Sequence, residues 1–418
     1  MDKVFNRHGP GATQQKAGSQ RQTDIFRITS GALGPVPVCE LEIKPFTVFV
    51  GRQGTGKSLV AQTLYFFEEL PFLAAFVKAT ERNVQSLSSE TIVRRILDQL
   101  RSHQRAFATF ANKKVTIEWT RSKPFIIDGK EYEAPLKFSA YSNNRLVVPG
   151  EGLLSFVAAA VSSVESPWRH AVFLPTERLV ISQLRSAIAE KVLSLPITYT
   201  LFFDWMNLAS RALSGIRRGS ISKEQLWVEN RGQEALGGEV VRRGEQWKWR
   251  FGPKNGQVFD LDMASSGQRA NWSIVYLAKA LFAMRVAGEV ARTVSIFVEE
   301  PEIHLHPAAQ VAMLEVLAYL VKNGFRVVVT THSLDLIYAL NNLVQASSLG
   351  ERVVEGAPPP EIRLSSNDVA VYNFVPDRPP QSIVDRSGFI DEGVLGEVAE
   401  ELTASMNTIG ANLPPVEN

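Results

Sequence analysis

Residues 51–58, GRQGTGKS, fit the pattern G-x-x-x-x-G-K-S. In this pattern backbone N–H groups surround phosphate oxygens, the lysine reaches the β and γ phosphates, and the last hydroxyl holds Mg²⁺. An apolar run at 46–50 precedes the segment and an apolar-periodic helix follows it, so an accidental glycine-rich turn is disfavoured. The sequence therefore predicts an ATP-type phosphate site. Its expected residues are Gly51, Arg52, Gln53, Gly54, Thr55, Gly56, Lys57, Ser58 and Leu59, with Ser58 as a metal ligand.

A second segment, SIFVEEPEIHLHP at 295–307, ends a buried apolar strand in two carboxylates. Ligands of open α/β sheets lie at the carboxyl edge of the strands, so Glu299 is expected to hold Mg²⁺ directly or through water. Glu300 is expected to polarise the water that attacks the γ-phosphate. Standing alone, the pair would read as a strand that ends in solvated acids. His304 and His306 form a His-x-His pair without a third convergent ligand, which is a weak metal signal.

Two further segments complete the set. RVVVTTHS at 326–333 places His332 just past a third buried strand, where it can hydrogen-bond a γ-phosphate, while Ser333 alone would explain a helix N-cap; both can hold. SSGQ at 265–268 places Ser265, Ser266, Gly267 and Gln268 at a helix N-terminus, which suits a phosphate, although Ser-Ser-Gly is also an ordinary turn.

In order and spacing, these motifs resemble those of the ABC-type ATPases. AVFLPTER (171–178), EEPEIHLHP and THSLDLI narrow the resemblance to the OLD/RecF-like branch, AAA-family ATPases with ABC-type heads that are common in phage-defence and toxin-like systems. The resemblance implies that two copies enclose two ATP molecules, with the SSGQ signature of one subunit at the γ-phosphate held by Lys57 of the other. SSGQ departs from the transporter-style LSGGQ, and Glu299 stands where many relatives have Asp.

The resemblance implies an α/β P-loop NTPase of ABC type, with a parallel core sheet, an antiparallel β lobe and a helical and β insertion. The implied function is an ATP-hydrolysing switch, slow and partner-regulated, that dimerises or forms a higher oligomer around ATP and Mg²⁺ and controls a separate effector such as a nuclease. The alternative is a RecF-like DNA clamp in repair. The insertion lacks the heptads of SMC-like proteins, and no E…DxD pattern follows Ser333, so an intrinsic nuclease is not expected.

The expected insertion also carries residues that could contact DNA directly. Basic side chains there alternate with Trp247 and Trp249, a mix that could grip a phosphate backbone and stack on bases. Solvated strand faces are the commoner explanation, and Glu239 and Glu245 dilute the charge. The basic residues are Arg217, Arg218, Arg242, Arg243, Lys248, Arg250 and Lys254.

The elements that position these residues divide the chain into four parts. Residues 1–23 are polar and read as a disordered tail rather than a signal peptide. The expected head halves are 24–110 and 263–418, the second ending in a helix at 389–405. The insertion at 111–262 shows β-like pieces with a turn at Asp128-Gly129, helical patterns at 152–164, 179–195 and 200–214, and a polar meander from 219.

The amino-acid composition limits which classes of function the protein can have. The 418 residues carry 45 Lys and Arg against 43 Asp and Glu, a net charge of +2 that excludes a dedicated polycation for coating nucleic acid. No apolar stretch reaches the ~20 residues that cross a bilayer, so no membrane contact is expected. The single cysteine, Cys39, cannot form an internal disulfide, which suits a reducing cytosol and predicts a cytoplasmic protein.

Overall fold

The structure is a computed structural model that describes most of the chain between Thr23 and Asp391. Several predicted features lie outside the described residues: the tail up to residue 22, the helical pattern at 179–195, the turn at 128–129, two basic residues at 217–218 and Lys254. The described residues are 23–80, 88–102, 114–127, 130–132, 136–140, 147–162, 169–178, 197–215, 221–244, 246–252, 256–391, 393, 403–409 and 412.

A six-stranded sheet of order β16-β15-β3-β14-β13-β9 forms the centre of the molecule. All neighbouring pairs are parallel except β15 and β16, so the buried strands predicted at 46–50, 295–298 and 326–330 are confirmed as parallel neighbours. The strands are β3 (Phe46–Gly51), β9 (Arg169–Leu174), β13 (Val290–Glu299), β14 (Arg326–Thr331), β15 (Val369–Phe374) and β16 (Gln381–Ser382).

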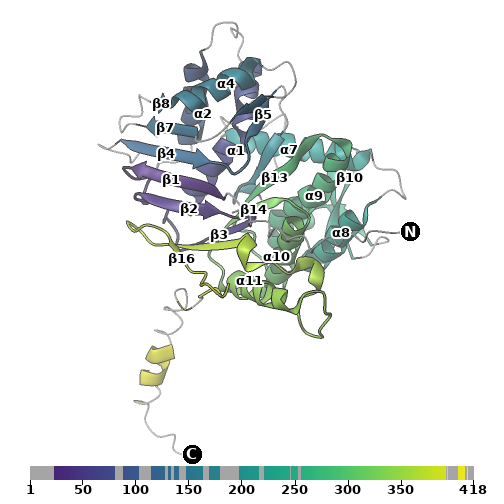
Figure 1. Ribbon diagram of the computed structural model, residues 1–418. Coiled ribbons are helices and arrows are strands. Elements are labelled where there is room, and N and C mark those ends of the chain that lie inside the picture. The colour runs from purple at the N-terminus through teal and green to yellow at the C-terminus, as the bar shows by residue number, and fades with distance from the viewer. Residues whose placement is uncertain are drawn as a thin grey trace, which may run out of the picture.

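Beside this sheet lies an antiparallel lobe of order β2-β1-β4-β7-β8, seen in purple and blue in Figure 1. A hairpin, β5 with β6, and a separate meander, β10-β11-β12, complete the described strands, and the predicted meander is confirmed. Their bounds are β1 (Asp24–Ser30), β2 (Cys39–Ile43), β4 (Val115–Thr120), β5 (Phe125–Ile127), β6 (Lys130–Tyr132), β7 (Leu136–Ala140), β8 (Val147–Pro149), β10 (Gly238–Arg243), β11 (Gln246–Phe251) and β12 (Val258–Asp260).

Helices cover both faces of the central sheet. The first group, α1, α2 and α4, packs between the central sheet and the lobe, while α8, α9, α10 and α11 pack on the opposite face (Figure 1). The helices are α1 (Lys57–Thr80), α2 (Ser89–Ser102), α4 (Glu151–Ser162), α7 (Ile197–Ser214), α8 (Lys223–Leu236), α9 (Ser266–Ala287), α10 (Pro307–Lys322) and α11 (Leu334–Gln345), with 3₁₀ turns η2 (Leu261–Met263), η3 (Ala346–Leu349), η4 (Pro360–Ile362) and η5 (Ser366–Asp368).

Strand alternation explains the two cores. In β3, Phe49 packs into the core shared with the lobe, whereas Val48 and Val50 pack into the core under α8–α11. β13 repeats the pattern, with Phe297 on the lobe side and its neighbours on the other. Because successive side chains of a strand point to opposite faces, a sheet buried on both faces needs such continuous apolar runs.

Two helices were not predicted. Residues 223–236, assigned to a polar meander, form α8, because a capping box of Ser222 and Gln225 starts the helix and Gly237 ends it with φ 68°. Helix α2 was also missed, whereas the helix N-cap considered at Ser333 is present and starts α11. The helix predicted at 389–405 is wrong at its start, where Ile390 forms a β-bridge with Val384, but in the described part of the chain residue 393 and residues 403–409 are helical.

The predicted fold class is confirmed. A parallel α/β core carries the glycine-rich loop directly after β3, and an antiparallel β lobe packs beside it, as in a P-loop NTPase of ABC type. The four-part division of the chain stays a prediction, but β9 comes from the expected insertion and lies at the edge of the central sheet. In the described part of the chain no helix meets the length and apolarity needed to span a membrane.

Candidate nucleotide site

Three of the predicted site segments meet at one edge of the central sheet. The glycine-rich loop follows β3, Glu299 ends β13, and His332 follows β14. Strand β14 pairs in parallel with both β3 and β13, so the carboxyl ends of all three strands lie side by side. Segments that are far apart in the sequence are therefore brought together at the edge where open α/β sheets bind ligands.

The Lys57 ammonium group lies inside the glycine-rich loop. It donates to the carbonyl oxygens of Gly51 at 2.8 Å and Arg52 at 2.7 Å, and Thr55 Oγ1 also donates to the Arg52 carbonyl at 2.9 Å. Burial lowers the pKa of Lys57 to about 8, and Glu300 opposes this by charge attraction. Arg52, Gln53 and Gly54 are exposed, so the loop presents its backbone to solvent.

Two glycines of this loop are required by the backbone. Gly51 has φ 137°, and a Cβ atom there would lie 2.3 Å from the carbonyl oxygen of Phe374. Gly56 has φ 94°, and its Cβ would lie 2.4 Å from Val36 Cγ2. Any larger residue would displace the loop from β15 or from the segment around Val36, so these glycines also serve the packing of the fold.

The Glu299 carboxylate is buried and held from three sides. Its oxygens accept from Gln62 Nε2 at 3.4 Å and from the Thr176 backbone at 3.2 Å, and Ser58 also hydrogen-bonds to it. Burial raises the pKa of Glu299 to about 7, against these hydrogen bonds. A hydroxyl and a carboxylate in contact are oxygen donors of the kind Mg²⁺ prefers, so Ser58 and Glu299 fit the predicted metal site.

Glu300 follows in a different environment. Its Oε1 atom lies 3.4 Å from His332 Nε2, and both side chains are about one-third exposed or less. The hydrogen bond from His332 lowers the pKa of Glu300 against the effect of burial. The backbone of Glu300 has φ 44°, a left-handed conformation that is uncommon for a residue other than glycine. The carboxylate is thus ionised, accessible and held in a strained turn.

The signature segment has local contacts that explain much of its sequence. Ser265 is the N-cap of α9 and forms a capping box with Gln268, whose Nε2 also donates to the Leu236 carbonyl at 2.8 Å. A Cβ atom on Gly267 would lie 2.4 Å from the His304 carbonyl oxygen, so this glycine lets α9 touch the loop after β13. Ser265 and Ser266 are exposed. Contact of this segment with a phosphate of a second subunit stays a prediction.

Five residues that contact the site segments were not assigned a role from the sequence. Glu302 Oε1 accepts from Thr331 Oγ1 at 2.7 Å and from the His332 backbone at 2.8 Å, and so fixes the turn that carries the histidine. Gln62 lies four residues after Ser58 on α1, a helical spacing that could have identified it. The residues are Gln62, Thr176, Arg178, Asn271 and Glu302.

The two histidines after Glu302 have backbone roles. His306 is the N-cap of α10 and its Nδ1 accepts from the Ala308 backbone at 3.3 Å. His304 has φ 58° in the preceding turn. Over the described ranges no group of three or more metal-ligating side chains was found, so the pair shows no third ligand there.

Of the expected basic residues, the two on β11 are paired with acids, whereas Arg242 and Arg243 on β10 are exposed, so DNA contact stays a prediction. Lys248 pairs with Asp260, and Arg250 pairs with Glu239. Trp249 is only 1% exposed. Trp247 packs against Trp272 and Tyr276 with ring centroids 5.0 and 4.9 Å away. Trp249 is therefore a core residue that cannot stack on bases, whereas Trp247 is partly buried and packs against α9.

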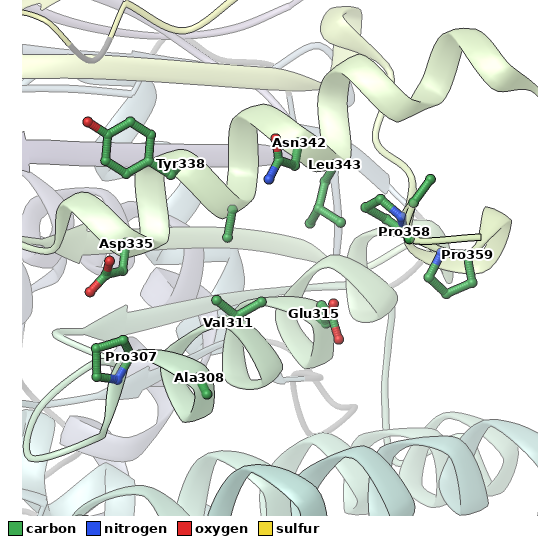
Figure 2. A pocket seen from close by; sticks show the side chains of 13 residues that line it. Pro307, Ala308, Val311, Glu315, Asp335, Tyr338, Asn342, Leu343, Pro358 and Pro359 are labelled. Atoms are coloured by element: carbon green, nitrogen blue, oxygen red, sulfur yellow. The ribbon is translucent and has the colours of Figure 1, made fainter. Parts of the chain in front are cut away.

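A groove of about 490 Å³ lies apart from the glycine-rich loop, between α10, α11 and the loop that contains Pro358. Figure 2 shows Val311 and Leu343 on neighbouring helices at its wall. None of Lys57, Glu299 and Glu300 lines it. The groove therefore forms no part of the candidate nucleotide site, which is defined by its chemistry and its place at the sheet edge.

Residues 216–337 match the family model described as AAA ATPase domain. With the geometry above, this match supports an ATP-binding ATPase of the AAA or ABC type. The matched residues include the signature segment, both candidate carboxylates and His332, but not the glycine-rich loop. No curated protein matches the chain.

Solved structures of SMC head domains are similar to the chain at low identity. The SMC head bound to the C-winged helix domain of ScpA has a TM-score of 0.42 and 12% identity over 86% of this chain and 96% of that chain. The SMC head domain from Thermotoga maritima has a TM-score of 0.37 and 11% identity, over 87% of this chain and 98% of that chain. A third structure is the Smc head domain with an extended coiled coil, bound to the C-terminal domain of ScpA derived from Pyrococcus furiosus. It has a TM-score of 0.38 and 12% identity, over 91% of this chain and 98% of that chain.

Proposed function

We propose that the protein is a slow, magnesium-dependent ATPase that dimerises around ATP and acts as a conformational switch for a separate effector, such as a nuclease, in an anti-phage defence or toxin-like system. The observation that carries the proposal is the meeting of Lys57, the Ser58–Glu299 contact and the Glu300–His332 pair at one sheet edge. The defence setting and the effector rest on the resemblance of the sequence motifs.

Each side chain of the candidate site has a distinct role in the proposed ATP hydrolysis. Lys57 and the loop backbone bind the β and γ phosphates, and Ser58 with Glu299 would hold Mg²⁺, which supplies charge neutralisation when bound. Glu300 is ionised and partly exposed, so it can accept a proton from an attacking water. His332 reaches the same space from β14, and its Nε2, which contacts Glu300 in this structure, can instead donate to a phosphate oxygen when ATP is bound.

Dimerisation supplies the switch. The exposed Ser265 and Ser266 lie at the N-terminus of α9, where backbone N–H groups attract an anion. If the γ-phosphate held by one subunit is bound by this turn of the other, ATP favours the closed dimer over separate subunits, and hydrolysis removes that preference. We do not propose a DNA clamp, because the described basic residues of β11 are paired with acids.

The proposal is tested by ATP hydrolysis and by the oligomeric state of the full chain with and without ATP and Mg²⁺. Lys57→Ala should lose nucleotide binding and ATP-dependent dimerisation. Lys223→Ala, at an exposed position on α8, is the matched control and should behave as wild type. Unchanged ATP affinity in Lys57→Ala would contradict the assignment of Lys57 to the phosphate site. A wild-type protein that hydrolyses ATP only as a monomer would contradict the proposed ATP-dependent dimer.

A further inference from the structure

Arg178 is a fully buried arginine between the candidate catalytic strand and the signature helix. Its Nε donates to the Ala270 carbonyl at 2.7 Å on α9. Its Nη1 donates to the Glu299 carbonyl at 2.5 Å and to the Pro175 carbonyl at 3.0 Å. Its Nη2 donates to the Glu300 carbonyl and to Asn271 Oδ1, both at 2.8 Å. A guanidinium has five N–H groups, and all five have an acceptor here.

Asn271 extends these contacts along the loop that follows β13. Its Nδ2 donates to the Ile303 carbonyl at 2.8 Å and to the Gly267 carbonyl at 3.0 Å. Arg178 therefore holds the loop at Glu299 and Glu300, and Asn271 holds the same loop three residues later. The close approach of Gly267 to His304 gives a third contact between this loop and the first turns of α9.

The strained backbone at Glu300 explains why the loop needs such support. A non-glycine residue with φ 44° is costly and persists only where its surroundings hold it in place. The Glu300 carbonyl accepts both from Arg178 and from the Ile303 backbone at 3.1 Å, so the arginine fixes the peptide plane that starts the turn. The direction of the Glu300 side chain toward His332 depends on that peptide plane.

We propose that Arg178 and Asn271 are positioning residues that join the signature turn of α9 and the Glu300 loop into one mechanical unit. The inference rests on the proposed function and deepens it. A phosphate bound by the signature turn in the partner's site would shift α9, and the shift reaches Glu300 of the same subunit through these hydrogen bonds. The two ATP sites of the dimer are then coupled in hydrolysis through residues that touch neither nucleotide.

The first test needs no nucleotide. Amide hydrogen exchange of the full chain is measured in wild type, Arg178→Lys and Asn271→Ala. Exchange at Ile303 and Leu305, whose N–H groups close the loop turns, should quicken about tenfold in both variants, together with the first turns of α9. Arg169→Lys is the control, since Arg169 is a buried arginine at the other end of β9 and pairs with Glu69.

Two results of this exchange experiment would overturn the inference. One is unchanged exchange of the 300–305 loop in Asn271→Ala, which removes a neutral side chain and keeps the proposal testable if Arg178→Lys does not fold. The other is equal acceleration of that loop in Arg169→Lys, which would indicate general loosening of the fold. Because no ATP is present, neither result depends on the proposed function.

The second test separates nucleotide binding from turnover. Arg178→Lys and Asn271→Ala should keep ATP affinity within about threefold of wild type, while kcat falls roughly tenfold or more. Asn271→Asp keeps an acceptor for Arg178 but loses both donated bonds, so kcat should stay low in this variant. Recovery of kcat in Asn271→Asp would show that Asn271 merely satisfies the arginine and would overturn the coupling. A wild type without ATPase activity would instead contradict the proposed function, and the exchange result would still stand.

Discussion

His332 Nε2 lies 3.4 Å from Glu300 Oε1, although the two residues follow different strands of the central sheet. In the register of β13 and β14, Glu299 is opposite Thr330, so each partner of this pair lies just beyond its own strand end. The contact thus follows from strand pairing rather than from nearness in sequence. It places an ionised carboxylate and an imidazole at the same side of the candidate phosphate site.

Glu300→Gln should bind ATP but hydrolyse it poorly. Glutamine keeps the size of the side chain and loses the ability to accept a proton, so kcat should fall about 100-fold or more. ATP affinity should change little, because Lys57 and the loop backbone are untouched, and the ATP-bound dimer should accumulate. Single-turnover hydrolysis and size-exclusion chromatography with light scattering measure both effects. Wild-type turnover in this variant would exclude Glu300 as the base.

His332→Ala should change the pH dependence of hydrolysis. The hydrogen bond from His332 is the largest cause of the lowered pKa of Glu300. Without it that pKa rises, so the acid side of the kcat profile should move to higher pH, where Glu300 becomes protonated earlier as pH falls. His306→Ala, which removes the N-cap histidine of α10, is the control and should leave the acid side in place. An unshifted profile in His332→Ala would contradict the contact.

Gly267→Ala should loosen the contact between α9 and the loop after β13. The added Cβ would lie 2.4 Å from the His304 carbonyl oxygen, a backbone atom that must move to make room. We expect a loss of about 1–3 kcal/mol in the free energy of unfolding and slower hydrolysis. Gly215→Ala is the matched control, because the atom nearest to its Cβ, the Arg211 carbonyl oxygen, would lie 3.6 Å away. Equal stability of the two variants in urea unfolding would argue against the close approach.

Asp24→Asn should weaken the attachment of the lobe to the central sheet. Asp24 on β1 is buried, pairs with Arg326 of β14 and accepts from the Ser122 backbone at 2.6 Å. Arg326 also pairs with Glu68 at 3.1 Å, so the buried arginine keeps one acidic partner in the variant. We expect the free energy of unfolding to fall by about 2 kcal/mol at neutral pH.

The pH dependence of the Asp24 variant follows from the sign of its pKa shift. Burial acts against ionisation, but Arg326 and the Ser122 hydrogen bonds outweigh it and hold the pKa of Asp24 below its usual 3.8. The stabilisation is therefore present above about pH 3.8 and is lost as pH falls through the lowered value. Urea unfolding at several pH values should show the two proteins converging in acid. Glu40→Gln, in an exposed pair with Arg27, is the control and should cost well under about 1 kcal/mol.

Local patterns were enough for the parts of the site that are contiguous in sequence. The glycine-rich loop, the apolar strands around it, the two carboxylates and His332 each follow a short rule that relates residue type to the end of a strand. The same rules failed at α8, because its buried face has few apolar residues and includes Gln225 and Glu229. Both side chains are instead satisfied by Lys279 of α9, Gln225 through the lysine carbonyl and Glu229 through the lysine ammonium group. The same rules also give no sign that Trp249 is buried, because its burial depends on the tertiary core.

The amino-acid sequence by itself determined the fold class and the chemical types at the site, since strand, turn and helix signals are local. Only the tertiary structure decided which strand ends are neighbours, that Ser58 contacts Glu299, and that Arg178 joins α9 to the Glu300 loop. The physical reason is that Arg178 donates to backbone carbonyls. Every residue carries a carbonyl, so an arginine that binds one leaves no complementary partner to find in the sequence.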